Sequence, residues 1–402
     1  MGTAPRCRSC RARTGHLVLD LGLQPACDYF PRCDSPGPDP DYPLQMWLCS
    51  ACGLAQLVAD PTVPEEPKGA EPAALIAQAA DAVAAAEAAG FLRSGGKVAE
   101  YGSPHGGSWL GLLADLGLAP VRDGEPADVV VDCFGLMHAA DQAAALAERA
   151  ARVAEGGVLL LQYHSLDAII RHGQWNVLRH GHYAYYSTTA LVTMLGAAGL
   201  RAESAWAFGL YGGTILLAAS RNTAGAAPAA QSVWSLLAED ARVGVCDQAA
   251  VAGLQRDCRA HADGLRTWLR AERTAGRTVL GYGAASRAVA LLRLAGIDNA
   301  LLPAIVDASP AKQGRRMPGT DIPVVHPAEL GARLPGAVLL FLADLRAEVR
   351  ASYPEVEAAG GRWVDADALS SRHHDASGCL QHEPEPLQAP APGRADAADR
   401  QS

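Results

Sequence analysis

A chain of 402 residues is too long for one ordinary hydrophobic core and predicts two or three domains, and a hydrophobic content of 49% is ample to fill them. The formal net charge of -9 excludes a general nucleic-acid binder, because no basic field is present to displace counterions from phosphates. No apolar run approaches the length of a membrane span and the first residues lack the apolar stretch of an export signal, so we expect a cytoplasmic protein without a membrane partner.

The N-terminal segment, residues 1–62, carries six of the ten cysteines. Four of them form two C-x-x-C knuckles: Cys7, Cys10, Cys49 and Cys52. Each knuckle offers two thiolates at a spacing that suits tetrahedral zinc, and cysteines of a cytosolic protein are more often ligands than disulfides. We therefore predict a structural zinc ion; the alternative, a reduced cluster without metal, leaves this Pro/Gly-rich segment with little to hold it together. Cys27 and Cys33 are interpreted as packing residues.

Residues 73–222 show the pattern of an α/β domain. After a Pro/Glu-rich connector, an alanine-rich helix is predicted over residues 73–89, and Gly90 ends it. Short apolar runs then alternate with helical segments, which indicates a parallel sheet covered by helices on both faces. The predicted strands cover residues 98–101, 128–133 and 158–162, with two more near Ala205 and at 215–218, and the helices between them cover 108–116 and 140–153.

A second α/β unit occupies residues 228–369. Residues 230–275 are predicted to be helical and end at Gly276. The strands that follow are expected at residues 278–282, 303–307, 337–342 and 362–364. A glycine turn opens each α/β unit directly after its first strand, so we expect two Rossmann-like domains. The segment 370–402 cannot bury a core and is predicted to be a disordered tail.

Several motifs resemble those of the nucleotide-sugar C-methyltransferases, which add a methyl branch to the deoxysugars of antibiotics. The zinc segment contributes the two knuckles, Asp20-Leu-Gly-Leu-Gln-Pro25 and Leu48-Cys-x-x-Cys-Gly-Leu-Ala-Gln56. The last domain contributes Gly281-Tyr-Gly-Ala-Ala-Ser-Arg287, Val306-Asp-Ala-Ser-Pro-Ala-Lys-Gln-Gly314 and Pro318-Gly-Thr-Asp-Ile-Pro-Val324. The middle matches more loosely, through Glu100-Tyr-Gly-Ser103, His138 with Asp141, and His180-Gly-His182 followed by Tyr185-Tyr-Ser187. The resemblance covers residues 7–367 in the family's own order.

The resemblance implies a small zinc-binding domain, a class I S-adenosylmethionine (SAM) methyltransferase domain in the middle, and a C-terminal domain that grips a nucleotide. It also implies an activity, the SAM-dependent C-methylation of a dTDP-linked keto-deoxysugar in secondary metabolism such as antibiotic biosynthesis. In that reaction a base removes the proton beside the keto group, and the resulting enolate attacks the methyl group.

His182 coincides with the catalytic histidine of the family's Tyr-His-Glu-His motif, and His180 and Arg179 beside it complete the catalytic candidates. An imidazole suits the task because it ionises near working pH. From the residues alone, a capping or core histidine in a His-rich stretch is the alternative. The motif departs from the family at two places, where Arg179 replaces the tyrosine and Gly181 replaces the glutamate.

The residues expected to bind SAM are Glu100, Gly102, Ser103, Gly106 and His138. A glycine loop before a helix N-terminus suits an anion or a carboxylate, although tight packing explains such a loop equally well. Pro104-His105 stands where the family has Asn-Asp, and Tyr211-Gly-Gly-Thr214 has tyrosine in place of a histidine. A tyrosine-rich motif that precedes the middle domain in the family is missing from the connector.

The middle domain is also shorter than a SAM-binding domain between Gly102 and Asp128. A SAM-binding sheet has two further strands between the positions of Gly102 and Asp128, and the first of them ends in an acid that binds the ribose hydroxyls. Here one helix and a short stretch fill that interval, which is too little for two strands and two crossovers. The sequence therefore predicts a sheet truncated on one side and weakened or altered SAM binding, with Asp123 or Glu125 as a substitute for the ribose acid.

The nucleotide of the sugar is expected to bind at the start of the second unit. The candidates are Tyr282, Gly283, Arg287, Asp307, Lys312 and Arg315, with Arg316 beside them. Glycines allow close approach of the backbone, a helix N-terminus favours a diphosphate, and arginine is a bidentate donor. A solvated basic loop is the alternative.

Three hypotheses follow. The first is a SAM-dependent C-methyltransferase of a nucleotide sugar. The second is a keto-sugar isomerase or epimerase on the same scaffold without SAM, using the Arg179–His182 stretch with Tyr185 and Tyr186 for proton transfer. The third is a non-catalytic protein that binds a sugar nucleotide. The sugar, the carbon attacked and the oligomeric state are left open.

Overall fold

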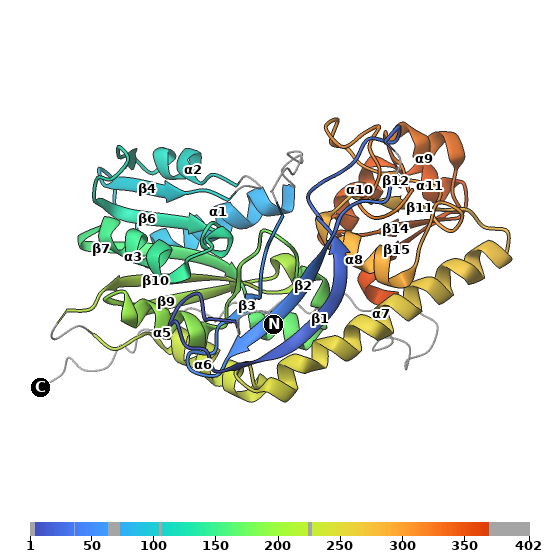
Figure 1. The fold of residues 1–402 in the computed structure, drawn as a ribbon. Helices are drawn as coiled ribbons and strands as arrows, with labels where there is room; N and C mark the ends of the chain where they lie inside the picture. Colours follow the sequence, from blue (N-terminus) through green and yellow to red (C-terminus); the bar gives the residue numbers. More distant parts are fainter. Residues whose placement is uncertain (1–4, 36, 63–72, 104–106, 224–226, 370–402) are drawn as a thin grey trace, which may run out of the picture.

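A computed structural model describes residues 5–35, 37–62, 73–103, 107–223 and 227–369 of the chain. It contains three sheets, one at the N-terminus, one in the middle segment and one at the C-terminal end (Figure 1). This confirms the predicted three-part α/β architecture. The proposed disordered tail, and the connector that lacks the tyrosine-rich motif, fall largely or wholly outside the described residues. None of the helices in the described part combines the length and the apolar composition that crossing a bilayer requires.

The N-terminal sheet is antiparallel and contains a strand from a distant part of the chain. Its order is β1-β2-β3-β8. The first three strands come from the cysteine-rich segment, but β8 lies in the middle segment, two residues after His182. β8 pairs with β3 through Ala55↔Tyr185 and Gln56↔Ala184, so the zinc-bearing segment directly supports the backbone next to His182. The bounds are β1 Gly15–Pro25, β2 Asp41–Cys49, β3 Ala55–Leu57 and β8 Ala184–Tyr185.

The middle sheet has six strands in the order β5-β4-β6-β7-β10-β9. Strands β5, β4, β6 and β7 are parallel, but β10 runs antiparallel to both β7 and β9, so the prediction of a wholly parallel sheet was wrong at this end. A tight Gly-Gly turn joins β9 to β10, and such a short connection permits only antiparallel pairing. The bounds are β4 Lys97–Tyr101, β5 Ala119–Pro120, β6 Ala127–Cys133, β7 Val153–His164, β9 Leu200–Phe208 and β10 Thr214–Arg221.

Helices cover both faces of this sheet. The alanine-rich helix α1 ends as predicted before Gly90, which has a φ of 80°. The helix expected between the strands at 128–133 and 158–162 is α3, and Asp141 caps it by accepting from the backbone N–H of Ala144. The bounds are α1 Ala73–Ala88, α2 Leu110–Asp115, α3 Gln142–Arg152, α4 Leu166–His172 and α5 Thr188–Ala197.

The predicted truncation is present in β5. This strand has two residues and pairs only with Lys97 and Val98 of β4, so in the described part of the chain the carboxyl end of β4 has no neighbour on that side. One of the two expected strands is thus reduced to a stub and the other is missing. Asp123 and Glu125 lie in the exposed turn after β5.

The C-terminal unit begins with two helices, since Gly244 at a φ of 80° divides the predicted helical run into α6 and the long α7. Its sheet is entirely parallel, in the order β13-β12-β11-β14-β15, and β13 is a strand that the sequence analysis did not predict. The helix bounds are α6 Gln231–Val243, α7 Gln248–Thr274, α8 Ser286–Ala295, α9 Ala328–Arg333, α10 Arg346–Ser352 and α11 Glu355–Ala358. The strand bounds are β11 Val279–Tyr282, β12 Ile305–Val306, β13 Val324–Val325, β14 Ala337–Leu340 and β15 Arg362–Asp365.

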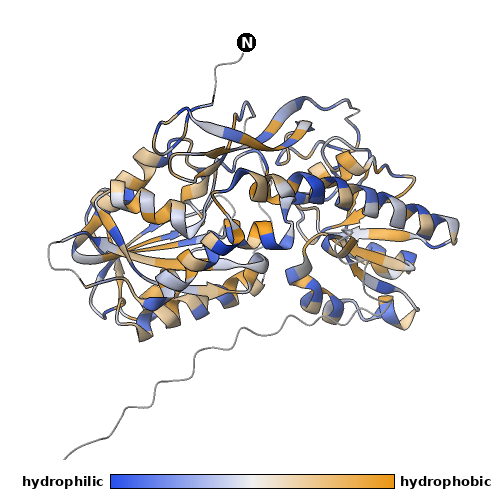
Figure 2. Cartoon of the chain, turned by 90° about the horizontal axis from the view of Figure 1, so that it is seen from below, coloured by the Kyte–Doolittle hydropathy of each residue, from blue (hydrophilic) through white to orange (hydrophobic). Residues whose placement is uncertain are grey.

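One hydrophobic core joins the segments. The apolar strands of the two large sheets lie inside, and polar residues colour the outer helices (Figure 2). A single cluster of buried residues takes members from β1, from α7 and α8, and from the stretch that leads to His182, where Trp175 is fully buried. The indole Nε1 of Trp175 donates to Nδ1 of His261 on α7 at 3.3 Å. This shared cluster holds the C-terminal unit against the middle segment, because its burial removes apolar side chains of both from water.

Candidate functional site

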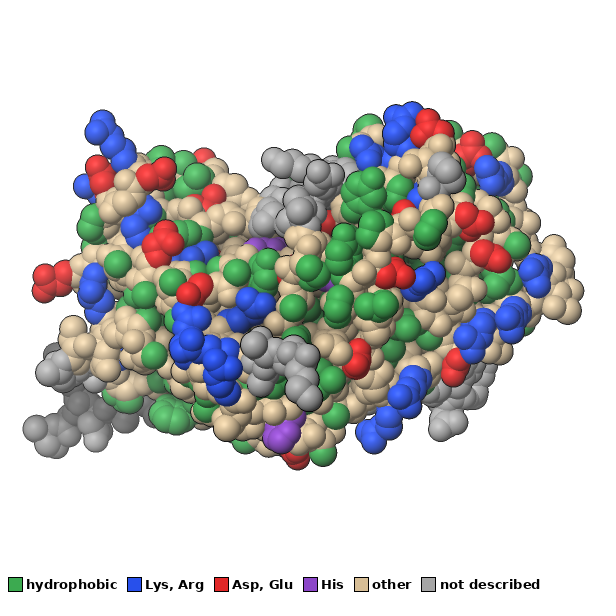
Figure 3. Space-filling view, viewed as in Figure 1, with side chains coloured by type: hydrophobic (Ala, Val, Ile, Leu, Met, Phe, Trp, Pro, Cys, Tyr) green, Lys and Arg blue, Asp and Glu red, His purple; other side chains and the backbone are tan. Residues whose placement is uncertain are grey.

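A cavity of about 240 Å³ lies where the carboxyl ends of β6 and β7 face the start of α8. Ligands bind at such carboxyl ends in open α/β sheets. Histidine side chains are visible between the two lobes of the molecule in Figure 3. The middle segment contributes its polar lining through Ser103, His138, His164, Arg179, His182 and Tyr211, and the C-terminal unit contributes Ser286, Arg287 and Lys312.

His182 lies in this cavity with one ring nitrogen engaged. Nε of Arg179 donates to Nε2 of His182 at 2.8 Å, so Nε2 carries no proton and the imidazole is neutral. The ring of His138 stands edge-on to His182, with centroids 4.7 Å apart. The arrangement provides an uncharged imidazole on the wall of the cavity.

His180 points elsewhere. Its ring is buried against the N-terminal sheet, where Nε2 lies 3.3 Å from the carbonyl oxygen of Pro43 and the ring edge meets Tyr42. Burial lowers the pKa of His180. The cause of the separation is Gly181, whose φ of 81° reverses the chain between the two histidines. Of the three catalytic candidates, the structure therefore brings His182 and Arg179 to the cavity and places His180 in the interface with the zinc segment.

Of the residues expected to bind SAM, only some line the cavity. Ser103 and His138 line the cavity, and Gly102 has open space where a side chain would be. Gly106 lies outside the described residues. Glu100 is used differently from the expectation, because its carboxylate accepts from the backbone N–H of Trp109 at 2.5 Å and from Oγ of Ser108 at 2.7 Å. It thereby holds the start of α2.

The described residues fit only one end of SAM. A Cβ on Gly135 would lie 3.0 Å from the carbonyl oxygens of Tyr101 and Gly102, so the loops after β4 and β6 touch through their backbones. The buried carboxylate of Asp132 is consumed by Arg149. β5 ends without an acid, and Asp123 and Glu125 lie beyond it in the turn. The loop at Gly102 and Ser103 together with His138 can hold the amino-acid end, whereas no carboxylate for the ribose extends from β5.

On the opposite wall, two cations of the C-terminal unit face the cavity. Arg287 donates to Oδ1 of Asn176 at 3.3 Å and to Oδ2 of Asp367 at 3.1 Å. Nζ of Lys312 donates to the carbonyl oxygen of Ala284 at 2.9 Å. Both side chains sit beside the N-terminus of α8, whose unpaired N–H groups favour an anion. This wall suits a phosphate-bearing ligand.

Three further residues of this unit were expected to bind the nucleotide, but their contacts in the structure are with the protein itself. Tyr282 is buried with its ring against Tyr353 and Trp363, in the core of the C-terminal sheet. Asp307 accepts from the backbone N–H groups of Ala284 and Ser309, both at 2.7 Å, and so shapes the turn that follows β11. That turn needs Gly283, which has a φ of 87°.

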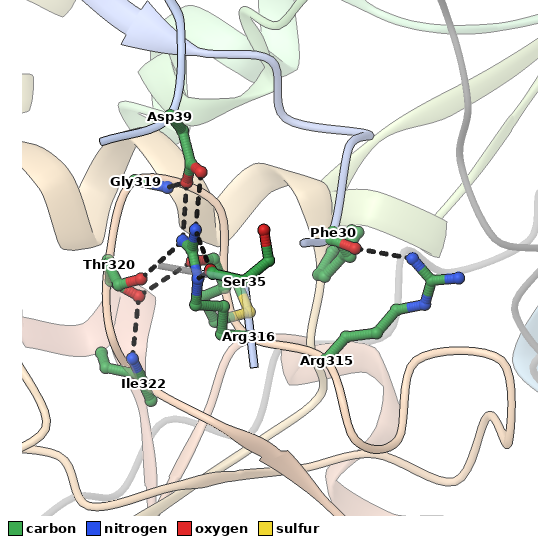
Figure 4. Close-up of polar contacts among 9 residues, drawn as sticks. Phe30, Ser35, Asp39, Arg315, Arg316, Gly319, Thr320 and Ile322 are labelled. Atoms are coloured by element: carbon green, nitrogen blue, oxygen red, sulfur yellow. Dashed lines mark hydrogen bonds and ion pairs between the residues drawn. The ribbon is translucent and has the colours of Figure 1, made fainter. Parts of the chain in front are cut away.

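Arg315 and Arg316 fasten the zinc segment to the C-terminal unit (Figure 4). Nη1 of Arg315 donates to the carbonyl oxygen of Phe30 at 2.7 Å. Arg316 makes a bidentate pair with Asp39, with both nitrogen–oxygen distances 2.7 Å and each side chain only 8% exposed. These charges are satisfied by protein groups, so the expected addition to the phosphate-binding wall is wrong for Arg316, and Arg315 does not line the cavity.

The four knuckle cysteines form the predicted metal site. Their sulfur atoms all lie within 4.8 Å of one another. Sγ of Cys7 is 3.6 Å from Sγ of Cys52, and the Cys10–Cys49 distance is also 3.6 Å. A tetrahedron with zinc–sulfur bonds of about 2.3 Å has edges of about 3.8 Å, so the donor set fits zinc. Of the two remaining cysteines, Cys27 is buried as expected, but Cys33 is exposed.

Sequence reasoning missed part of the cavity wall. Phe134, Tyr211 and His164 line it, and the first two have positive φ values of 59° and 56°. Tyr211 was noticed only as a departure from the family pattern. The signal that could have identified it is the pair of glycines that follows, because Gly-Gly allows the sharp turn that aims the preceding side chain.

Comparison with known proteins matches three domain families in succession. Residues 7–65 match a zinc binding domain, residues 69–205 a methyltransferase domain, and residues 209–366 the C-methyltransferase C-terminal domain. C-methyltransferase NovU from Streptomyces niveus is 26% identical over 238 residues, which cover 58% of this chain and 54% of NovU. The match thus spans about half the length of that relative.

Solved methyltransferases are more distant. Magnesium protoporphyrin IX methyltransferase from Synechocystis PCC 6803 is 14% identical, with a TM-score of 0.28, and the alignment covers 37% of this chain and 84% of that one. The CcbJ methyltransferase from Streptomyces caelestis is 15% identical, with a TM-score of 0.27 and coverages of 40% and 94%. At these scores the likeness supports no argument. The chain thus resembles a C-methyltransferase with an N-terminal zinc binding domain, through three successive domain matches and its similarity to NovU.

Proposed function

We propose that the protein transfers a methyl group from SAM to a carbon beside the keto group of a dTDP-linked deoxysugar, with His182 as the base. The observation that carries the proposal is the placement of His182 between two walls. Ser103, which follows β4, lines one side of the cavity, and the cationic start of α8 lines the other. The match to the C-methyltransferase C-terminal domain and the similarity to C-methyltransferase NovU support the reaction type.

The first task of the chain is to remove a proton. The unprotonated Nε2 of a neutral imidazole can accept the proton from the carbon beside a carbonyl group once Arg179 moves from Nε2 to the substrate, and a positioned base of this kind contributes about 10²- to 10⁴-fold to the rate. Before the substrate binds, Arg179 orients the ring through its hydrogen bond to Nε2. Its guanidinium can also stabilise the negative charge that develops on the substrate, because it remains charged at all working pH values.

The second task is to hold the sugar nucleotide. Arg287 and Lys312 supply positive charge beside the first turn of α8, where Ser286 is the first helical residue. A diphosphate at this point would leave the sugar directed toward the middle segment. The apolar residues Leu136 and Met137 on the facing wall exclude water from the reacting carbon.

SAM, when bound, supplies the electrophilic methyl group. Gly102, Ser103 and His138 are the described residues that would hold its amino-acid end. They approach the cavity from the carboxyl ends of β4 and β6, on the side of the middle sheet. This arrangement would set the methyl donor and the sugar on opposite sides of one pocket.

A second candidate function is favoured by the shortened sheet. Because β5 offers no ribose acid, the same cavity without SAM would remain competent for proton transfer alone. That chemistry is the isomerisation or epimerisation of a keto sugar. A non-catalytic sugar-nucleotide binder would need neither His182 nor Arg179.

The test compares three proteins in one assay. Zinc-loaded wild type, His182→Ala and the exposed-residue control His16→Ala are incubated with radiolabelled SAM and dTDP-4-keto-6-deoxyglucose. The proposal predicts label in the sugar for wild type and His16→Ala, and at least a hundredfold lower rate for His182→Ala. Equal rates for His182→Ala and wild type would exclude His182 as the base, and no label with any protein would exclude methyl transfer to this sugar.

A further inference from the structure

Tyr211 occupies a costly backbone conformation on the wall of the cavity. It belongs to the turn between β9 and β10, where three successive residues have positive φ values, 56° at Tyr211, 78° at Gly212 and 157° at Gly213. A tyrosine in this region costs about 1–3 kcal/mol and persists only where surrounding contacts determine it. Such strain is concentrated at functional sites.

Two hydrogen bonds and a close contact with α4 hold this turn in place. Nε2 of Gln174 donates to the carbonyl oxygen of Tyr211 at 2.9 Å, and Oγ1 of Thr214 donates to that of Leu210 at 2.9 Å. A Cβ on Gly213 would lie 2.4 Å from Cβ of Ala168. The backbone is therefore pressed against α4, and this packing directs the tyrosine ring into the cavity.

Inside the cavity the ring packs on two aromatic neighbours. Its centroid is 6.0 Å from that of Phe134 and 6.2 Å from that of His164. Phe134 also has a positive φ, 59°, at the carboxyl end of β6. Two strained aromatic residues from different strands thus meet on one wall. Among the described residues, the Tyr211 hydroxyl has no hydrogen-bond partner, so it is available to a ligand in the cavity.

The surroundings keep this hydroxyl protonated. Burial raises the pKa of Tyr211, and the nearby positive charges of Arg179 and Arg287 only partly oppose that effect. Burial also lowers the pKa of His164 to about 3, so the ring beside Tyr211 is neutral. A protonated phenol among neutral aromatic rings is a hydrogen-bond donor rather than a base.

We propose that Tyr211 is a second catalytic residue, whose hydroxyl donates a hydrogen bond to the keto oxygen of the sugar while His182 removes the neighbouring proton. The inference rests on the proposed function. In the step, the C–H bond breaks and its proton moves to the imidazole. The electron pair forms a carbon–carbon double bond, and the carbonyl π pair moves to the oxygen, where the phenol stabilises the enolate. Reversal of the step returns a proton to carbon.

This step can be measured without any methyl donor. Protein and dTDP-4-keto-6-deoxyglucose are mixed in heavy water, and proton NMR follows loss of the signal from the C–H groups beside the keto group. Loss of one oxyanion donor costs about 10²- to 10³-fold. Tyr211→Phe keeps the aromatic packing and is expected to lower the exchange rate by that factor, with sugar-nucleotide affinity and melting temperature unchanged. Tyr29→Phe, at an exposed position outside the cavity, is the matched control.

Tyr211→His provides a second variant, because a neutral imidazole retains an N–H donor at the same place. It is expected to exchange faster than Tyr211→Phe. If Tyr211→Phe exchanges the proton at the wild-type rate while His182→Ala does not exchange it, the inference about Tyr211 is overturned. The role of His182 as the base is then still supported. If wild type itself shows no exchange, the proposed function fails and the role of Tyr211 fails with it.

Discussion

Arg179 donates through Nε to Nε2 of His182 at 2.8 Å, within the middle segment. The same guanidinium donates through Nη1 to Oγ of Ser286 at 2.6 Å, at the first turn of α8. One side chain therefore connects the imidazole with the helix that would receive the phosphates. We therefore expect substrate binding at α8 to be linked to the orientation of the base through Arg179.

Replacing Arg179 tests this link. Arg179→Met removes both hydrogen bonds while it keeps most of the side-chain volume, and we expect the rate of proton exchange to fall about tenfold to a hundredfold because the imidazole is no longer oriented. Ser286→Ala removes only the contact to α8 and should have a smaller effect. Heavy-water exchange kinetics measure both, and an Arg179→Met rate equal to that of wild type would contradict the positioning role.

The zinc site should support the cavity as well as its own segment. Cys10→Ser removes one of four thiolates, and structural zinc sites contribute folding energy directly. We expect loss of bound zinc, a lower melting temperature and loss of activity, because β3 pairs with β8 beside His182. Zinc analysis and thermal unfolding measure these effects. Cys33→Ser, at an exposed cysteine outside the cluster, is the control, and full activity in zinc-free Cys10→Ser protein would refute the coupling.

Two glycines of α7 should respond oppositely to the same substitution. A Cβ on Gly264 would lie 2.0 Å from the carbonyl oxygen of Leu369, whereas one on Gly253 meets only a guanidinium nitrogen of Arg256 at 3.5 Å. Alanine in a helix interior is favoured over glycine by about 0.5–1 kcal/mol. Gly253→Ala should thus raise the free energy of unfolding, and Gly264→Ala should lower it. Denaturant unfolding decides the signs, and stabilisation by Gly264→Ala would show that Leu369 does not pack there.

Asp240 gives a prediction for pH. Its carboxylate accepts from the N–H and Oγ1 of Thr189 at 2.7 and 2.9 Å, and burial raises its pKa from 3.8 to about 6. The folded state then binds the proton more tightly than the unfolded state, so this group loses stabilisation as pH rises from about 4 to about 6. Asp240→Asn keeps one oxygen acceptor without titrating.

Relative to wild type, Asp240→Asn should therefore gain about 1–3 kcal/mol in the free energy of unfolding between pH 4 and pH 7. Denaturant unfolding at the two pH values measures the gain. Asp263→Asn, at an exposed position on α7, controls for the general loss of one negative charge. A difference between wild type and Asp240→Asn that does not change with pH would mean that Asp240 titrates normally in the folded protein.

Local signals in the sequence predicted local structure well. The cysteine knuckles identified the metal site because C-x-x-C spacing is itself the ligand geometry, and period and glycine placement identified the strands around 98–101 and 128–133. The antiparallel direction of β10 and the transfer of β8 to the N-terminal sheet depend on pairings between distant residues. No local pattern encodes such pairings.

The cavity was predictable only in part. His182 and Arg287 were found through motifs, and both face the pocket. Glu100 and Arg316 carry the right charges for a ligand, but protein partners consume them, and those partners were not apparent from local spacing. Tyr211 was missed because its importance comes from a strained turn packed against α4, which only the assembled fold reveals.

We infer that this cavity joins a methyl group to a sugar carbon despite the shortened sheet. The most direct measurement uses SAM with a carbon-13 methyl group and dTDP-4-keto-6-deoxyglucose whose sugar is uniformly labelled with carbon-13, followed by carbon NMR of the product. We expect a new methyl signal that is split by one-bond coupling to a ring carbon. A sugar that exchanges its ring proton with solvent but gains no methyl carbon, or gains one on oxygen, would contradict it.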